Sequence, residues 1–534
     1  MDRRFLFKAS AAALVVGCGS HEEEKPPYMP PPAWPLAQPS SHGASAITNV
    51  PHPELVDLSI TELGTRYTAV QLVDMYTARI AALASLNAVI ELDPDARTIA
   101  AQLDQEKKRG LLHGMPILVK DNIDTAGTMR TTAGSLAFEH PAPRDATVVA
   151  KLRAAGAIVL GKANLSEWAN LRGLGSISGW SARGGQTRNP YALDRNTSGS
   201  SSGSAAAAAA SMCAAALGSE TDGSITSPAS LCSLVGLKPT VGLVSRAGVI
   251  PISSSQDTVG PMGRCVADVA ALLGAIAGPD PDDPATVGAR VGDYLAHLDP
   301  KALAGARIGI PRKGWFGASR TIDSVMTGVI SKLGELGANV IDDIALEINP
   351  KLGGLEILVF ACEMRAAMEA YLSRRGDPKL RGMMDLLAFD YLHPAELRWF
   401  GHEYFDMAQQ HSGLQDAGYD AARAQCLAMS RDVIDAAIQK DRLDAIVVGT
   451  GGLPWLIDPI GGDALTPGPN APTLPAVAGY PHVTVPAGFY HSLPIGMSFI
   501  GTAYTEAKLL GYAYAFEQAT KARRPPRFLA TAEI

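Results

Sequence analysis

Hydrophobic and polar residues alternate with two different spacings in the first third of the chain, and these spacings predict alternating helices and strands. Segment 68–85 has apolar residues at helical spacing, and Thr68 with Gln71 has the form of a capping box. The expected order is a helix at 68–85, a strand at 88–92, a helix at 95–109, a strand at 116–120, a helix at 147–155 and a strand at 158–160. This rhythm predicts a mixed, mostly parallel sheet between layers of helices, an α/β fold of the α/β/α sandwich type.

Composition narrows the class of protein. Of 534 residues, 47% are hydrophobic and 19% are charged, so the chain can bury a large core. No run of 18 apolar residues predicts a transmembrane helix. The net charge of −7 gives no basic surface, so no nucleic-acid partner is expected. Apart from Cys18, the cysteines are scattered without Cys-x-x-Cys spacing, which favours buried thiols over a disulfide framework.

Three polar positions in small or apolar surroundings are the candidates for chemistry: Lys120, Ser200 and Ser224. Lys120 ends the run Gly-Met-Pro-Ile-Leu-Val-Lys. Burial there would disfavour the ammonium and lower the pKa of the amine until it can act as a base. These positions together are typical of a serine hydrolase whose base is a lysine.

Ser200 lies in the Gly- and Ser-rich stretch 198–204, which leads into an alanine-rich segment expected to be a helix at 204–217. A flexible linker is the alternative, but linkers seldom run into such a helix. Gly199–Gly203 also fits the Gly-x-Ser-x-Gly elbow with Ser201 as nucleophile. The elbow requires a preceding strand, and 188–197 is too polar and too broken for one. Ser201 is therefore interpreted as a structural or hydrogen-bonding loop residue.

Ser224 lies in a second stretch of glycines and small residues, 218–228. Successive backbone N–H groups in such a turn can form a concavity that binds an oxyanion. Taken alone this signal is weak, and its place after the alanine-rich segment strengthens it.

These motifs allow a resemblance to be named. From about residue 54 to 526 the chain resembles the amidase signature family, serine hydrolases that cleave carboxamides with a Ser-Ser-Lys triad. The most specific motifs are at 113–123, 198–204, 221–225 and 235–245. Segment 176–191 and the Glu-Thr-Asp-Gly-Ser form of the turn resemble the bacterial peptide amidases. The resemblance implies Ser224 as nucleophile, Ser200 as a bridging serine after a cis peptide bond, and Lys120 as base. It also implies an oxyanion hole from the backbone N–H groups of Thr221, Asp222, Gly223 and Ser224.

The chain departs from the commonest family pattern at two positions. Asp222 and Ser202 stand where glycine is usual, and neither change removes a reacting group. Candidates for substrate binding are Ala169, Asn170, Ser201 and Trp455. The resemblance further implies one catalytic domain at 54–534, with a variable, mostly helical region at about 280–441.

Three functions are weighed at this point. The first is an exported amidase for peptide amides or small carboxamides. The second is an amidotransferase-type component that works with partner subunits, and an export signal argues against it. The third is a non-catalytic binding lipoprotein, disfavoured because all three reacting residues are present.

No cofactor is expected, and no metal, since His402–Asp406 lacks the second histidine of the His-Glu-x-x-His motif. The sequence does not fix the oligomeric state.

The N-terminus predicts export. Residues 1–8 are basic, 9–17 are apolar, and Val15-Val-Gly-Cys18 resembles a bacterial lipobox. Segment 1–18 is thus expected to be an export signal, with Cys18 lipidated and the protein held at the cell envelope or periplasm. Residues 3–8 also resemble the twin-arginine motif, and the export route stays open. An ordinary secretory peptide is the alternative. Segment 19–53, rich in proline, is expected to be a disordered tether.

Overall fold

A computed structural model describes residues 46–533 of the chain. The export signal, Cys18 and most of the expected tether lie outside these residues. The end of the tether lies within them. Ala46 N–H donates to Phe528 O, and the buried Arg79 side chain donates to Pro51 O and His52 O. A buried guanidinium needs acceptors, so these contacts hold residues 46–53 against the folded domain.

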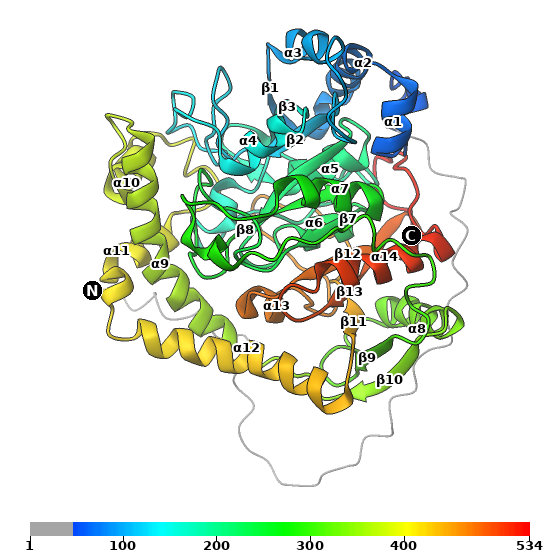
Figure 1. Cartoon of the computed structure of the whole chain (residues 1–534). Coiled ribbons are helices and arrows are strands. Elements are labelled where there is room, and N and C mark those ends of the chain that lie inside the picture. Colours follow the sequence, from blue (N-terminus) through cyan, green and yellow to red (C-terminus); the bar gives the residue numbers. More distant parts are fainter. Residues whose placement is uncertain (1–45, 534) are drawn as a thin grey trace. The chain divides into compact units, whose positions relative to one another are not determined.

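Among the described residues, the main sheet has eleven strands in mixed orientation (Figure 1). Their spatial order is β1 (Val89–Leu92), β3 (Ile158–Ala163), β2 (Pro116–Lys120), β6 (Ala215–Glu220), β8 (Thr258–Gly263), β7 (Val235–Lys238), β12 (His482–Tyr490), β13 (Leu493–Ile500), β11 (Ala445–Gly449), β9 (Arg307–Pro311) and β10 (Asn339–Ile344). A separate two-stranded sheet pairs β4 (Trp180–Ser181) with β5 (Gly185–Gln186).

The mixed sheet between helices is confirmed, but the expectation that it is mostly parallel is wrong. Within the described part of the chain, four of its ten strand pairings are parallel: β3 with β2, β2 with β6, β11 with β9, and β9 with β10. Crossover connections of the βαβ type occur only in those two blocks. The central strands are antiparallel, and β12 and β13 form a hairpin.

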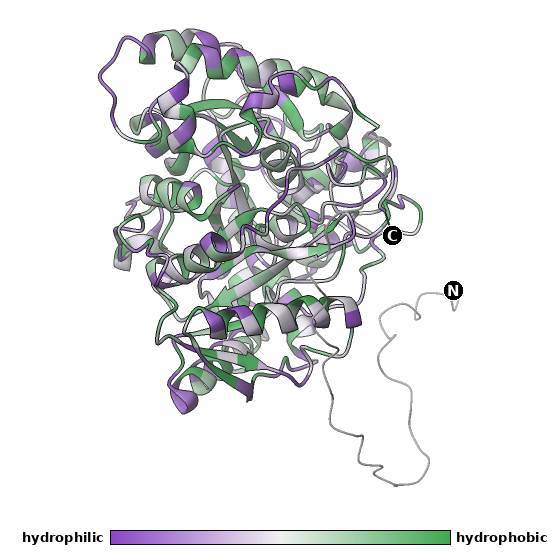
Figure 2. Ribbon diagram, turned by 90° about the vertical axis from the view of Figure 1, so that its right-hand side faces the viewer, coloured by the Kyte–Doolittle hydropathy of each residue, from purple (hydrophilic) through white to green (hydrophobic). Residues whose placement is uncertain are grey.

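Helices cover the sheet. They are α1 (Ile60–Arg66), α2 (Ala69–Ala82), α3 (Ala96–Leu103), α4 (Thr147–Ala154), α5 (Ser202–Ala209), α6 (Thr226–Leu231), α7 (Val266–Ile276), α8 (Arg320–Glu335), α9 (Leu352–Arg375), α10 (Met383–Leu392), α11 (Glu403–Gln410), α12 (Tyr419–Asp441), α13 (Thr473–Ala478) and α14 (Glu506–Thr520). The contacting pair α5 and α6 packs on the central strands, and α4, α7 and α14 form another layer. In Figure 2 the hydrophobic colour follows the strands, and the hydrophilic colour lies mainly on helices and loops.

Two expected helices are shorter than the sequence predicts. The helix expected at 95–109 ends at Leu103, because the Asp104 carboxylate turns back to accept the N–H groups of Ala69 and Val70 at the start of α2. The alanine-rich helix ends at Ala209, and after a turn the last residues of that run, 215–217, enter the sheet as the start of β6.

The region 280–441 contains the helices α8 to α12 and also the strands β9 and β10 of the main sheet. No helix in the described part of the chain has the length and apolar character needed to cross a membrane. The five cysteines of the described chain are free thiols, four of them buried.

Candidate active site

Lys120 is the last residue of β2, between β3 and β6, and its side chain is fully buried. Its Nζ lies 2.7 Å from Ser200 Oγ, 3.0 Å from Ser219 Oγ and 3.1 Å from Ser219 O. Burial lowers the pKa of this amine from 10.5 to about 7, against the opposing charges of Asp257 and Glu220. A large fraction of the amines is therefore neutral at pH 7, as a base requires.

Ser200 follows a cis peptide bond from Gly199, as the family resemblance implies. Its carbonyl accepts the Ser166 N–H at 3.0 Å, and the neighbouring Ser202 hydroxyl donates to Ser198 O. These bonds fix the loop at the start of α5, so Ser200 Oγ is held against the lysine.

Ser224 lies in the turn between β6 and α6. The Glu220 carboxylate accepts the N–H groups of Ile225 and Thr226, which closes the turn behind the serine. Thr221 Oγ1 donates to Asp257 at 2.6 Å, and Gly223 has a φ of 77° that favours glycine.

The backbone N–H groups of this turn are available to a ligand. In the part of the chain that the structure describes, the N–H groups of residues 221–224 donate to no other protein group. Unpaired N–H groups that converge on a reacting carbonyl stabilise its oxyanion.

The two serine segments lie side by side. Ser201 N–H donates to Ser224 O at 3.0 Å, and Ser201 Oγ donates to Ser219 O at 3.1 Å. Between the described residues there is a hydrogen bond from Lys120 to Ser200 but none from Ser200 Oγ to Ser224 Oγ. A proton relay between these two serines would require a serine side chain to rotate about its χ1 angle, so that the two hydroxyl groups form a hydrogen bond.

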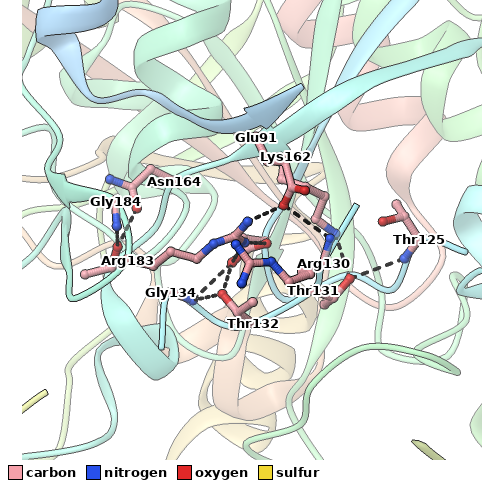
Figure 3. A network of polar contacts seen from close by, with 12 residues as sticks. Glu91, Thr125, Arg130, Thr131, Thr132, Gly134, Lys162, Asn164, Arg183 and Gly184 are labelled. Atoms are coloured by element: carbon pink, nitrogen blue, oxygen red, sulfur yellow. Dashed lines mark hydrogen bonds and ion pairs between the residues drawn. The ribbon is translucent and has the colours of Figure 1, made fainter. Parts of the chain in front are cut away.

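A polar network that includes Glu91, Arg183 and Thr132 (Figure 3) reaches the residue next to Lys120 in the chain. Asp121, the next residue, accepts from Thr132 Oγ1 and from Gly134 N–H, and Arg183 lies 3.4 Å from it. Arg183 also pairs with Glu91 at the edge of the sheet. The network ties three chain segments to the end of β2, so Lys120 cannot shift toward solvent without breaking buried polar contacts.

A cleft of about 640 Å³ opens beside the two serine loops. Its lining includes Ser198 and Gly199 from the first loop and Asp222 from the second. Asn170 and Trp455, both candidates for substrate binding, line the same cleft. The volume is in the range of small-molecule and peptide sites.

The other two candidates for substrate binding are placed differently. Ala169 packs against an apolar cluster that includes Trp168, and Ser201 is fully buried with its hydroxyl bonded to the β6 backbone. Neither is among the residues that line the cleft. A structural role for Ser201 fits this position better than substrate contact.

Several residues support the site without having been predicted as functional. Ser219 bridges Lys120 and Asn122, and Gln256 donates to both Thr221 O and Glu356. Ser219 belongs to a motif already singled out. Nothing in the sequence connects Gln256 or Glu356 with the turn, because they are 32 and 132 residues beyond Ser224.

One group of side chains in the described chain has atoms close enough to share a metal ion. Cys362, His411 and Asp416 offer ligand atoms within 4.8 Å of one another. The His411–Asp416 pair is also a direct hydrogen bond of 2.9 Å, so these side chains hold the end of α11 without an ion. They are not part of the Lys120 and Ser200 site.

Comparison with known proteins places the chain among amide-hydrolysing enzymes. The Amidase family matches residues 71–510. The structure of a peptide amidase from Stenotrophomonas maltophilia superposes with a TM-score of 0.85 at 46% identity, covering 90% of this chain and all of the other. A protein named Probable amidase from Arabidopsis thaliana is 39% identical over 505 residues, which is 91% of this chain and 93% of that one.

A similarity to an amidotransferase component is weaker. The corresponding component of the glutamyl-tRNA(Gln) amidotransferase from Thermotoga maritima gives a TM-score of 0.68 at 28% identity, covering 91% of this chain and all of the other.

Proposed function

This chain belongs to the amidase family and hydrolyses carboxamide C–N bonds, and we propose that it does so with Ser224 as nucleophile, Ser200 as proton relay and Lys120 as base. The observation that carries the assignment is the fully buried Lys120 amine, 2.7 Å from Ser200 Oγ, with its pKa lowered to about 7.

Chemistry follows from this arrangement. Neutral Lys120 accepts the proton of Ser200 as Ser200 accepts that of Ser224, and Ser224 Oγ bonds to the amide carbon. The carbonyl oxygen becomes an oxyanion among the N–H groups of 221–224. The relay then returns the proton to the leaving nitrogen, the C–N bond breaks and ammonia or an amine departs. Water repeats the sequence on the acyl-enzyme and releases the acid and free Ser224.

We further propose peptide amides as the substrate, with the C-terminal amide released as ammonia. Likeness to the peptide amidase supports this. So does the rim of the cleft, where Leu174 and Leu465 line the opening and are 67% and 69% exposed. Apolar side chains exposed at a cleft mouth are suited to contact with the side chains of a bound peptide.

The amidotransferase alternative has less support. Both the TM-score and the identity are higher for the peptide amidase than for the amidotransferase component.

The test is ammonia release from a panel of peptide amides, aliphatic amides and aryl amides. Ser224→Ala should abolish turnover of every substrate that the native enzyme accepts, and Ser201→Ala, which keeps the reacting groups, should retain activity. Peptide amides should give the highest kcat/KM. Activity on the simple amides alone would contradict the substrate proposal, and activity of Ser224→Ala would contradict the nucleophile.

We also propose export and lipid attachment at Cys18. The support is the order of basic residues, apolar residues and Cys18 at the N-terminus.

A further inference from the structure

The cleft beside the nucleophile is acidic. Among the described residues that line it there are two carboxylates, Asp222 and Asp463, and no lysine, arginine or histidine. The excess of negative charge in the cleft lining disfavours anionic ligands. A free peptide acid is such a ligand, because it differs from its amide by a negative charge at the reacting end.

The two carboxylates have different surroundings. Asp463 is hydrogen-bonded on several sides, accepting from Ser178 N–H at 3.0 Å and from Trp455 Nε1 at 3.1 Å. Asp222 accepts only one hydrogen bond from the described chain, at Oδ2 from Thr473 Oγ1 at 2.8 Å. Its side chain is partly exposed in the cleft, so Oδ1 can meet a ligand.

Asp222 is also close to the reacting centre. It stands two residues before Ser224, on the turn whose N–H groups have no protein acceptor in the described chain and are proposed to bind the oxyanion. Because consecutive Cα atoms are about 3.8 Å apart, the two Cα atoms are within roughly 8 Å. That separation is comparable to the Debye length at physiological ionic strength, so salt only partly screens the charge.

From these observations we propose that Asp222 selects carboxamides over carboxylates: its Oδ1 accepts the N–H of the carboxamide nitrogen and its charge repels a carboxylate in the same position. The inference rests on the proposed function at Ser224. It implies that the acid product is expelled and that free peptide acids do not block the enzyme.

Neighbouring charges set the pH range of this selection. Burial, with a smaller contribution from the charge of Glu220 on β6, raises the pKa of Asp222 to about 7, against the Thr473 hydrogen bond and the charge of Lys238 on β7, which lower it. Glu356 on α9 is the other carboxyl facing it, and burial and Asp222 raise the pKa of Glu356. Asp222 is therefore ionised above about pH 7, and repulsion of acids should weaken below that pH.

The experiment compares one peptide as C-terminal amide and as free acid. The quantity measured is the ratio of the acid's inhibition constant to the KM of the amide, between about pH 6 and pH 8.5. In the native enzyme the ratio should rise with pH through about 7. In Asp222→Asn it should fall about tenfold at the alkaline end of this range and lose its pH dependence, because a like charge across a contact is costly. Asp458→Asn removes a charge outside the cleft lining and should leave the ratio unchanged.

A second variant protects the test against misfolding of the first. Thr473→Val keeps Asp222 and removes the hydroxyl that donates to it. This hydrogen bond lowers the pKa of Asp222, so without it the pH at which the ratio rises should move upward. An unchanged ratio in Asp222→Asn, or an unshifted midpoint in Thr473→Val, overturns the proposal. If the native enzyme hydrolyses no peptide amide, the proposed function fails, and calorimetric binding of the two peptides still decides the role of Asp222.

Discussion

Lys120 is suited to the proposed role of base because its amine ends a buried strand and lacks a direct carboxylate partner in the described structure. Its contacts are hydroxyl and carbonyl oxygens of Ser200 and Ser219. Desolvation therefore dominates, and the pKa falls to about 7.

The pH dependence of activity follows with a definite sign. The protonated amine cannot accept a proton, so kcat/KM should be lost as pH falls through about 7 and should stay high into the alkaline range. Asp222→Asn should keep this limb, because Asp257 and Glu220 are the charges that act on Lys120. A limb near pH 10 would contradict a neutral buried amine.

Lys120 should matter more for amides than for esters. The leaving amine needs a proton and an alkoxide needs it less, so Lys120→Ala should lower amide hydrolysis at least about tenfold more than ester hydrolysis. The measurement is the ratio of the two kcat/KM values on matched acyl groups. Equal losses would remove Lys120 from leaving-group protonation.

At the scale of single residues, the sequence motifs predicted the contact between Lys120 and Ser200 and the turn around Ser224. They did not predict which residues hold these groups. Asp257 and Gln256 reach the turn from a segment that is distant in sequence, and only the fold brings them together.

At the scale of helices and strands, the segment that contains α5 shows that helix propensity alone does not predict where a helix ends. The alanine run predicts one long helix, but the helix ends at Ala209 and the last three residues of the run, 215–217, begin β6, which pairs with β2 and β8. Alanine is small enough to fit either a close-packed helix or a crowded central strand, and the pairing partners decide.

Gly203 in α5 gives an element-scale prediction. A Cβ there would come within 2.5 Å of Asn164 backbone atoms and 2.3 Å of Ala88 O. Gly203→Ala should therefore lower the free energy of unfolding by about 1–3 kcal/mol, although alanine normally favours a helix. Gly328→Ala in α8, with no atom within 4 Å of the new Cβ, should raise it by up to about 1 kcal/mol.

Urea denaturation of the two glycine variants and the native protein measures this difference. Equal signs for both variants would mean that α5 does not approach β1 and β3 as closely as described.

For the whole molecule, the sequence predicted a mixed sheet between helices. It overestimated the parallel pairings because the βαβ rhythm was observed only in the first 160 residues. Strands β9 and β10 within 280–441 were missed, since short strands between long helices give little periodic signal.

The proposed lipid attachment at Cys18 concerns the cellular location of the whole protein. Cys18→Ser should abolish incorporation of labelled palmitate and leave the protein unprocessed or mislocalised when expressed in a bacterial host. The control is Cys265→Ser, a partly exposed thiol of the folded domain, which should be labelled like the native protein. Equal release of native and Cys18→Ser protein in soluble form would indicate a plain signal peptide.

The most direct test of the proposed mechanism is to locate the covalent adduct of a fluorophosphonate by peptide mass mapping. The adduct should be on Ser224, should be absent in Ser224→Ala, and should form more slowly below about pH 7, where Lys120 is protonated. An adduct on Ser201 with Ser224 unmodified would contradict the assignment of the nucleophile.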